Sequence, residues 1–85
     1  MPTVKREAGF TIKVNTRGKH NPPHVHVIKG GGEIRVKMGD DETPPSYWDE
    51  KCPMALQDKV KAVFLVDKYQ AECLEVWRKF NGHIR

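Results

Sequence analysis

The chain has 85 residues, of which 38% are hydrophobic and 31% are charged, and its formal net charge is +4. Because so short a chain cannot divide its apolar residues between two cores, we expect a single domain over residues 1–85. No apolar stretch reaches the length of a membrane span, so we expect a cytoplasmic protein with no membrane partner. Cys52 and Cys73 are too few for a disulfide framework or a four-cysteine zinc site.

The positive charge is concentrated in the first 39 residues, where only Glu7 and Glu33 oppose the lysines and arginines. Residues 40–52 reverse the balance with an acidic cluster. A basic half beside an acidic segment favours a polyanionic partner such as nucleic acid, or a protein of mixed charge. A charge excess this small also fits a solvated surface without a partner.

Alternating apolar and polar residues predict three strands within residues 9–39. The alternation covers residues 10–14, 24–27 and 33–38, and Gly30-Gly31-Gly32 joins the last two segments in a pattern typical of a hairpin. We therefore expect a three-stranded antiparallel β-meander over residues 9–39.

The hairpin turn has two allowed positions. Directly opposed residues of an antiparallel pair point to the same face, so Val27 must oppose an apolar residue. A Gly30-Gly31 turn pairs Val27 with Ile34, whereas a Gly31-Gly32 turn pairs it with Val36. The sequence leaves both registers open.

Both registers place His24 and His26 on the outward face of the sheet among basic residues. The first register sets His26 opposite Arg35 and His24 opposite Lys37, and the second sets His26 opposite Lys37. Lys13 joins this face if the first strand pairs alongside. The histidines are thus predicted to lie on a basic surface.

Residues 40–53 contain three prolines and the acidic cluster, and are predicted to form a connecting loop with Tyr47 and Trp48 tucked against the sheet. Residues 54–82 are predicted to be helical, because neither Gly nor Pro interrupts Met54 to Phe80. Apolar residues at helical spacing predict a core-facing stripe that starts with Leu56, Val60, Val63 and Phe64.

A straight helix over the whole helical region would run roughly 40 Å, so we expect a bend or break near residues 67–70. The predicted fold class is α+β: a three-stranded antiparallel β-meander, packed on one face by a bent C-terminal helix or by two consecutive helices.

The segment His20-Asn21-Pro22-Pro23-His24-Val25-His26 carries the candidate chemistry. Three imidazoles and a water could form an open site for zinc or another divalent metal through His20, His24 and His26. Opposed Arg35 and Lys37 would repel a dication, and Glu33 is the nearest carboxylate that could orient a ring. We therefore favour no metal cofactor, and keep the metal-binding module as an alternative.

The same histidines suit metal-independent cleavage of RNA. A neighbouring cation lowers the pKa of a histidine, which keeps the ring neutral and able to act as a base. His24 and His26 could then serve as base and acid, while cations stabilise the phosphorane. This ribonuclease is the other alternative.

A third interpretation is binding without catalysis. The histidines then pack against Trp48 or the first strand, or contact a protein. Six residues form the candidate surface for nucleic acid or another anion: Lys13, Arg17, Lys19, His20, Arg35 and Lys37.

Two motifs extend this picture. The first is His20-x-Pro22-Pro23-His24-x-His26-Val27, and the second is Lys68-Tyr69-Gln70-x-Glu72-x-Leu74-Glu75-x-Trp77-x-x-Phe80-x-Gly82. Together they resemble the bacterial and archaeal family called domain of unknown function 4160. Its members are often encoded beside another small domain, as in toxin–antitoxin pairs. The resemblance implies a cognate small-protein partner and nucleic-acid contact, but no reaction. We therefore expect a toxin–antitoxin-like accessory protein that uses its His/Lys/Arg sheet face to bind nucleic acid or that partner.

Overall fold

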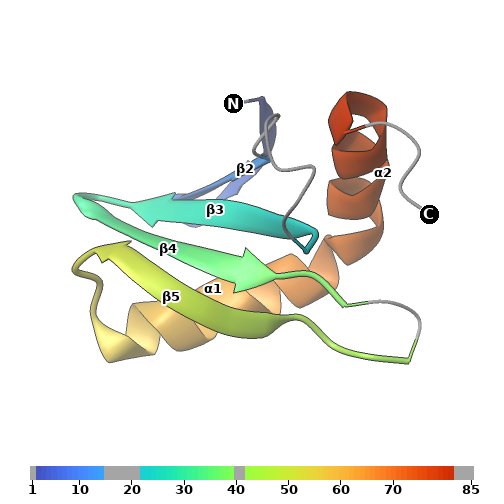
Figure 1. Cartoon of the computed structure of the whole chain (residues 1–85). Helices are drawn as coiled ribbons and strands as arrows, with labels where there is room; N and C mark the ends of the chain where they lie inside the picture. Colours follow the sequence, from blue (N-terminus) through green and yellow to red (C-terminus); the bar gives the residue numbers. More distant parts are fainter. Residues whose placement is uncertain (1, 15–21, 40–41, 82–85) are drawn as a thin grey trace.

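The computed structural model describes residues 2–14, 22–39 and 42–81, which form an α+β fold (Figure 1). An antiparallel sheet has the strand order β1-β2-β3-β4-β5, so each strand pairs with its neighbours in the sequence. The strands are β1 (Thr3–Glu7), β2 (Phe10–Val14), β3 (His24–Lys29), β4 (Gly32–Lys37) and β5 (Ser46–Cys52). Two helices follow, α1 (Leu56–Lys68) and α2 (Gln70–Asn81).

The prediction of three strands was wrong, because the sheet has five. Strand β5 lies inside the predicted loop 40–53, and β1 precedes the predicted meander. Both are edge strands, so they lack the apolar alternation of strands that bury one face. The prolines flank β5 at Pro45 and Pro53 rather than interrupt it.

The hairpin of β3 and β4 uses the first of the two predicted registers. Lys29 pairs with Gly32 across a two-residue turn, and Val27 pairs with Ile34. Gly30 takes the left-handed conformation that this turn requires, at φ 57°. His26 therefore opposes Arg35 on one side, and it opposes Lys13 of β2 on the other.

The core lies between one face of the sheet and the two helices. Helix α1 packs against β4 and β5, whereas α2 packs against β1 and β2, so together they cover the sheet (Figure 1). The buried apolar residues are Phe10, Ile12, Val14, Val25, Val27, Ile34, Val36, Met38, Met54, Ala62, Val66, Cys73 and Trp77. Neither helix is long and apolar enough to cross a membrane.

The predicted break in the helical region is confirmed at Tyr69, which separates α1 from α2 with φ −111° and ψ 19°. The Tyr69 hydroxyl donates a hydrogen bond to the Glu7 carboxylate of β1. Lys68 adds an ion pair to Glu7 at 3.3 Å. The break is thus fastened to the edge of the sheet.

The predicted core stripe of α1 was wrong at Leu56, Val60 and Phe64, whereas Val63 packs against the core. Leu56 and Phe64 are 75% and 70% exposed, whereas the buried residues of α1 are Ala62 and Val66. The small side chain of Ala62 contributes little to an apolar periodicity, yet it lets the helix approach the sheet closely. Helix α1 therefore carries a second apolar side that nothing in the described residues covers.

Candidate functional site

The site centres on two histidines at the start of β3. His24 and His26 share one face of the strand, because residues two apart project to the same side. The prediction that the two histidines lie on an outward-facing basic surface was wrong, because they are only 1% and 4% exposed. Their rings lie 5.4 Å apart between centroids.

Two tryptophans enclose His24. The Trp48 ring meets it edge-on at 5.0 Å, and the Trp77 ring of α2 lies 5.5 Å away. The predicted contact between a histidine and Trp48 is thereby confirmed. Trp77 connects the histidine pair to the core, because it belongs to the same buried cluster as Cys73 and Val66.

Each histidine uses its Nδ1 atom as a hydrogen-bond donor. His24 Nδ1 lies 3.0 Å from the carbonyl oxygen of Pro22, and His26 Nδ1 lies 2.9 Å from Oε2 of Glu33. A carbonyl or carboxylate oxygen can only accept, so both protons reside on Nδ1. In the neutral rings, Nε2 is therefore the atom with a free lone pair.

Both Nε2 atoms are buried, and neither has a hydrogen-bond partner among the described residues. Buried polar atoms without a partner are rare in folded proteins, because each loses its hydration without compensation. Two such atoms on adjacent rings indicate a place where a ligand would be stabilised.

Burial lowers the pKa of His24, because desolvation disfavours the charged ring. The Pro22 carbonyl opposes this effect, and the charges of His26 and Arg35 add to it. His24 is thus held in the neutral form that can offer an Nε2 lone pair.

Arg35 reaches the site from β4 but is engaged by β5. Its guanidinium donates to both carboxylate oxygens of Asp49, with Nε 2.6 Å from Oδ1. Its Cζ also stacks 4.1 Å from the centroid of the Trp48 ring. The pairing lowers the pKa of Asp49 and raises that of Arg35, so both groups stay charged and mutually compensated.

A β-bulge brings these partners together. Arg35 pairs with Asp49 and the next residue, Val36, pairs with Tyr47, so Trp48 is the extra residue of β5. The bulge lets Trp48 and Asp49 both contact Arg35. Sequence reasoning missed Asp49, because its segment was predicted to be a loop.

The other predicted binding residues are only partly brought together. Lys37 opposes His24, is exposed and places Nζ 5.3 Å from the Trp48 ring. Lys13 opposes His26 and is half-buried. The remaining predicted residues, Arg17, Lys19 and His20, lie outside the described residues.

Two basic groups of the site are paired with carboxylates. Arg35 is bound to Asp49 and His26 to Glu33. Residues 2–14, 22–39 and 42–81 hold no cluster of three or more His, Cys, Asp or Glu residues that could ligate a metal. The expected third ligand, His20, falls outside these ranges.

Fold and site together define a small α+β domain with a buried histidine pair under an arginine–tryptophan stack. The family described as Domain of unknown function (DUF4160) matches residues 9–78, and the chain belongs to this family. The match runs from the β1–β2 turn into α2, so it includes both histidines and Trp77. No curated protein and no solved structure gave a match.

Proposed function

We propose that this domain binds a divalent metal ion through Nε2 of His24 and Nε2 of His26. The observation that carries the proposal is that both atoms are buried and unpartnered among the described residues, while both Nδ1 atoms donate to oxygen. Metal-ligating histidines usually donate the other ring N–H to a carbonyl or carboxylate, which fixes the tautomer and raises the basicity of the ligand.

Two sequence-based objections to a metal are weakened in this geometry. Arg35 and Lys37 were expected to repel a dication; Asp49 compensates the charge of Arg35, and Lys37 is exposed to solvent. An orienting carboxylate was expected only from Glu33, and Glu33 accepts the hydrogen bond from His26. Burial of His24 further favours its neutral form, the one that ligates metal.

Imidazole nitrogens suit zinc, nickel, copper and cobalt better than calcium or magnesium, so the metal belongs to the first group. Two nitrogens do not complete a tetrahedral shell, and further donors are needed. His20 remains the third ligand predicted from the sequence, and it is tested as a separate variant.

The test is titration of tag-free, metal-free protein with Zn²⁺ and Co²⁺, followed by calorimetry and by the visible absorption of bound Co²⁺. His24→Asn and His26→Asn are the sharpest variants, because the Asn amide can still donate from the position of Nδ1 but offers nothing at Nε2. Both variants should lose binding while they retain the fold by circular dichroism. His83→Ala is the matched control, and it should bind as the wild type does.

A third variant, His20→Ala, measures the contribution of the predicted third ligand. Zn²⁺ binding that persists unchanged when His24 and His26 are both replaced by Asn would refute the proposal. So would the absence of both heat and Co²⁺ absorption in the wild type.

The ribonuclease alternative draws less support from the geometry. A general base must come within hydrogen-bond reach of the substrate hydroxyl, and both Nε2 atoms are enclosed. Arg35, the nearest candidate to stabilise a phosphorane, is committed to Asp49. Incubation of the protein with RNA, beside the two Asn variants, tests this alternative directly.

Nucleic-acid binding through the sheet face remains a prediction. Two lysines among the described residues support it. Lys13 and Lys37 form no ion pair with any residue that the structure describes. Electrostatic binding would weaken steeply with salt, and it should weaken further in Lys37→Gln. The toxin–antitoxin-like role likewise rests on the family resemblance. Helix α1 offers a candidate surface for the small-protein partner that this role implies.

A further inference from the structure

The exposed side of α1 carries an apolar stripe made of Leu56, Val60 and Phe64. These residues are spaced by four and therefore stack along one side of the helix. They are 75%, 48% and 70% exposed, respectively. Contiguous apolar patches on soluble domains commonly mark interaction surfaces.

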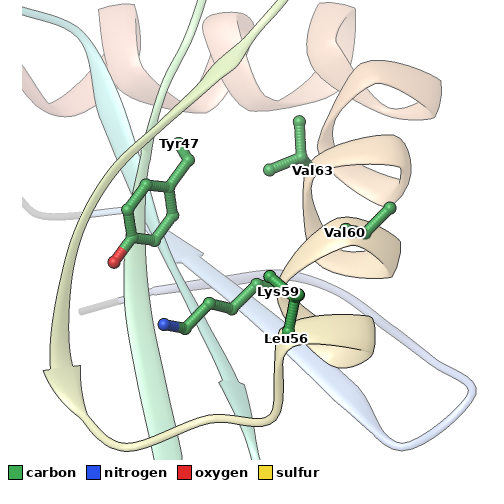
Figure 2. A pocket seen from close by; sticks show the side chains of 5 residues that line it. All are labelled: Tyr47, Leu56, Lys59, Val60 and Val63. Carbon is green, nitrogen blue, oxygen red and sulfur yellow. The ribbon is translucent and has the colours of Figure 1, made fainter.

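A pocket of about 300 Å³ adjoins the stripe, between α1 and the edge strand β5. Its lining is formed by Tyr47, Leu56, Lys59, Val60 and Val63. Figure 2 shows Tyr47 of β5 facing α1, with Lys59 and Val63 pointing toward it. The pocket is almost wholly apolar, so it offers a recess for a large apolar side chain beside the stripe.

Lysines flank the stripe on both sides. At about 100° per residue, Lys59 projects on the side of the stripe that faces β5, and Lys61 projects on the opposite side. Lys59 Nζ lies 3.1 Å from Glu50 and 5.4 Å from the Tyr47 ring. Lys61 is exposed and forms no ion pair with the described residues. Lys61 thus adds an uncompensated cation on one side of the stripe, whereas Glu50 compensates the charge of Lys59 on the other side.

An extended peptide added to the free edge of β5 fits this surface poorly. The register of β5 shifts twice against β4, and such bulges interrupt the regular row of hydrogen-bonding groups. Asp49, Glu50 and Lys51 also place charges along the same edge. Bulges and charges are the usual features that protect an edge from strand addition.

A second copy of the chain also fits poorly. If two α1 helices packed antiparallel about a two-fold axis near Val60, each Lys61 would lie beside the other copy's Lys61. A parallel arrangement would set Lys61 beside Lys59 of the other copy. Like charges at the rim of an apolar contact oppose binding.

We infer that this surface docks an amphipathic helix of a partner protein, with apolar residues against the stripe and acidic residues along the flank that faces Lys61. A large apolar side chain of that helix would enter the pocket beside Tyr47. This is the helix-in-groove mode of recognition, with charge complementarity supplied by Lys61. The inference does not depend on the proposed metal ligands, His24 and His26, which lie on β3.

The probe is a synthetic helical peptide of about four turns, with leucines at helical spacing along one side and glutamates on both flanks of that side. A matched peptide carries lysine at each glutamate position. Fluorescence anisotropy with the full chain should show that the acidic peptide binds in the micromolar range and the basic peptide at least about tenfold more weakly.

Three variants separate this surface from the rest of the molecule. Val60→Glu should weaken the acidic peptide at least about tenfold. Lys61→Glu should weaken the acidic peptide and strengthen the basic one, an exchange that loss of stability cannot produce. Phe80→Glu is the control, because Phe80 is similarly exposed, at 48%, but lies on α2.

Four outcomes would overturn the inference. The first two are that neither peptide binds the wild type, and that both bind equally. The third is that Val60→Glu binds as the wild type does. The last is a wild-type dimer, detected by sedimentation, that Val60→Glu dissociates; it would identify a second copy as the occupant.

Discussion

His26 and Glu33 face each other diagonally across the β3–β4 hairpin, with Nδ1 2.9 Å from Oε2. The His26 side chain is 5% exposed and that of Glu33 is 24% exposed, so a partly hydrated carboxylate orients an enclosed ring. This hydrogen bond links the β3–β4 hairpin to the proposed metal site.

The first prediction concerns this carboxylate. Glu33→Gln keeps a hydrogen-bond acceptor for His26 but removes the negative charge that makes Nε2 more basic. Calorimetry should show Zn²⁺ affinity reduced by about 10- to 100-fold, the usual cost of losing such a partner. Glu75→Gln, on the exposed side of α2, should leave the affinity unchanged. Equal affinities in the two variants would mean that Glu33 serves only the fold.

The second prediction concerns the pH dependence of the link between Tyr69 and Glu7. The Tyr69 hydroxyl, with help from Lys68, lowers the pKa of Glu7 below its ordinary 4.5. A carboxyl with a lowered pKa stabilises the fold above the unfolded value, and this contribution is lost as the pH falls through the folded pKa. Tyr69→Phe should therefore lower Tm most near neutrality, and the difference from the wild type should narrow below pH 4.5.

Thermal melts in the Glu7→Gln background provide the control for this second prediction. Without the carboxylate, the remaining cost of Tyr69→Phe should no longer vary with pH over the same range. A cost with the same pH dependence in both backgrounds would assign the effect to another group.

The third prediction concerns Gly32, at the start of β4. A Cβ at this position would lie 2.7 Å from the Pro53 carbonyl oxygen and 2.9 Å from Cβ of Met54. Gly32→Ala should therefore cost about 1–3 kcal/mol in the free energy of unfolding, measured in urea. Gly31→Ala meets nothing within 4 Å and should change the stability by less than about 0.5 kcal/mol. Similar losses in both variants would exclude this close contact as the cause.

The fourth prediction concerns the two thiols. Burial raises the pKa of Cys73 to about 12, whereas Cys52 is exposed. The thiolate is the reactive form, so a thiol reagent should label one cysteine of the native protein and the second only after denaturation. Cys52→Ser should remove the native labelling entirely. Rapid labelling of that variant would show that Cys73 is accessible.

Strand parity and turn chemistry account for the part of the fold that the sequence predicts. Val25 and Val27 alternate with the histidines, and this alternation correctly placed His24 and His26 on the same side of the sheet as Arg35. Three consecutive glycines limited the hairpin to two registers, one of which is found. Local pattern sufficed here, because the buried apolar residues of β2, β3 and β4 lie on one face of the sheet.

The burial of the histidines could not be predicted in the same way. Trp48 and Asp49 complete the site from a bulged edge strand whose charges and flanking prolines are typical of a loop. Pairing with β4, rather than local propensity, makes that segment a strand. The side of α1 that faces the core could not be predicted either, because the exposed stripe of this helix is more strongly apolar than its buried side around Ala62.

The order of the elements has a consequence for the growing chain. All five strands of the sheet precede both helices, and Trp77, near the end of α2, is the last buried core residue in the part of the chain that the structure describes. During synthesis the sheet can pair strand by strand as each hairpin emerges, yet its apolar face and the Trp77 side of His24 stay uncovered until α2 leaves the ribosome. A nascent chain arrested before Trp77 should therefore offer chaperones an apolar sheet that the finished protein conceals.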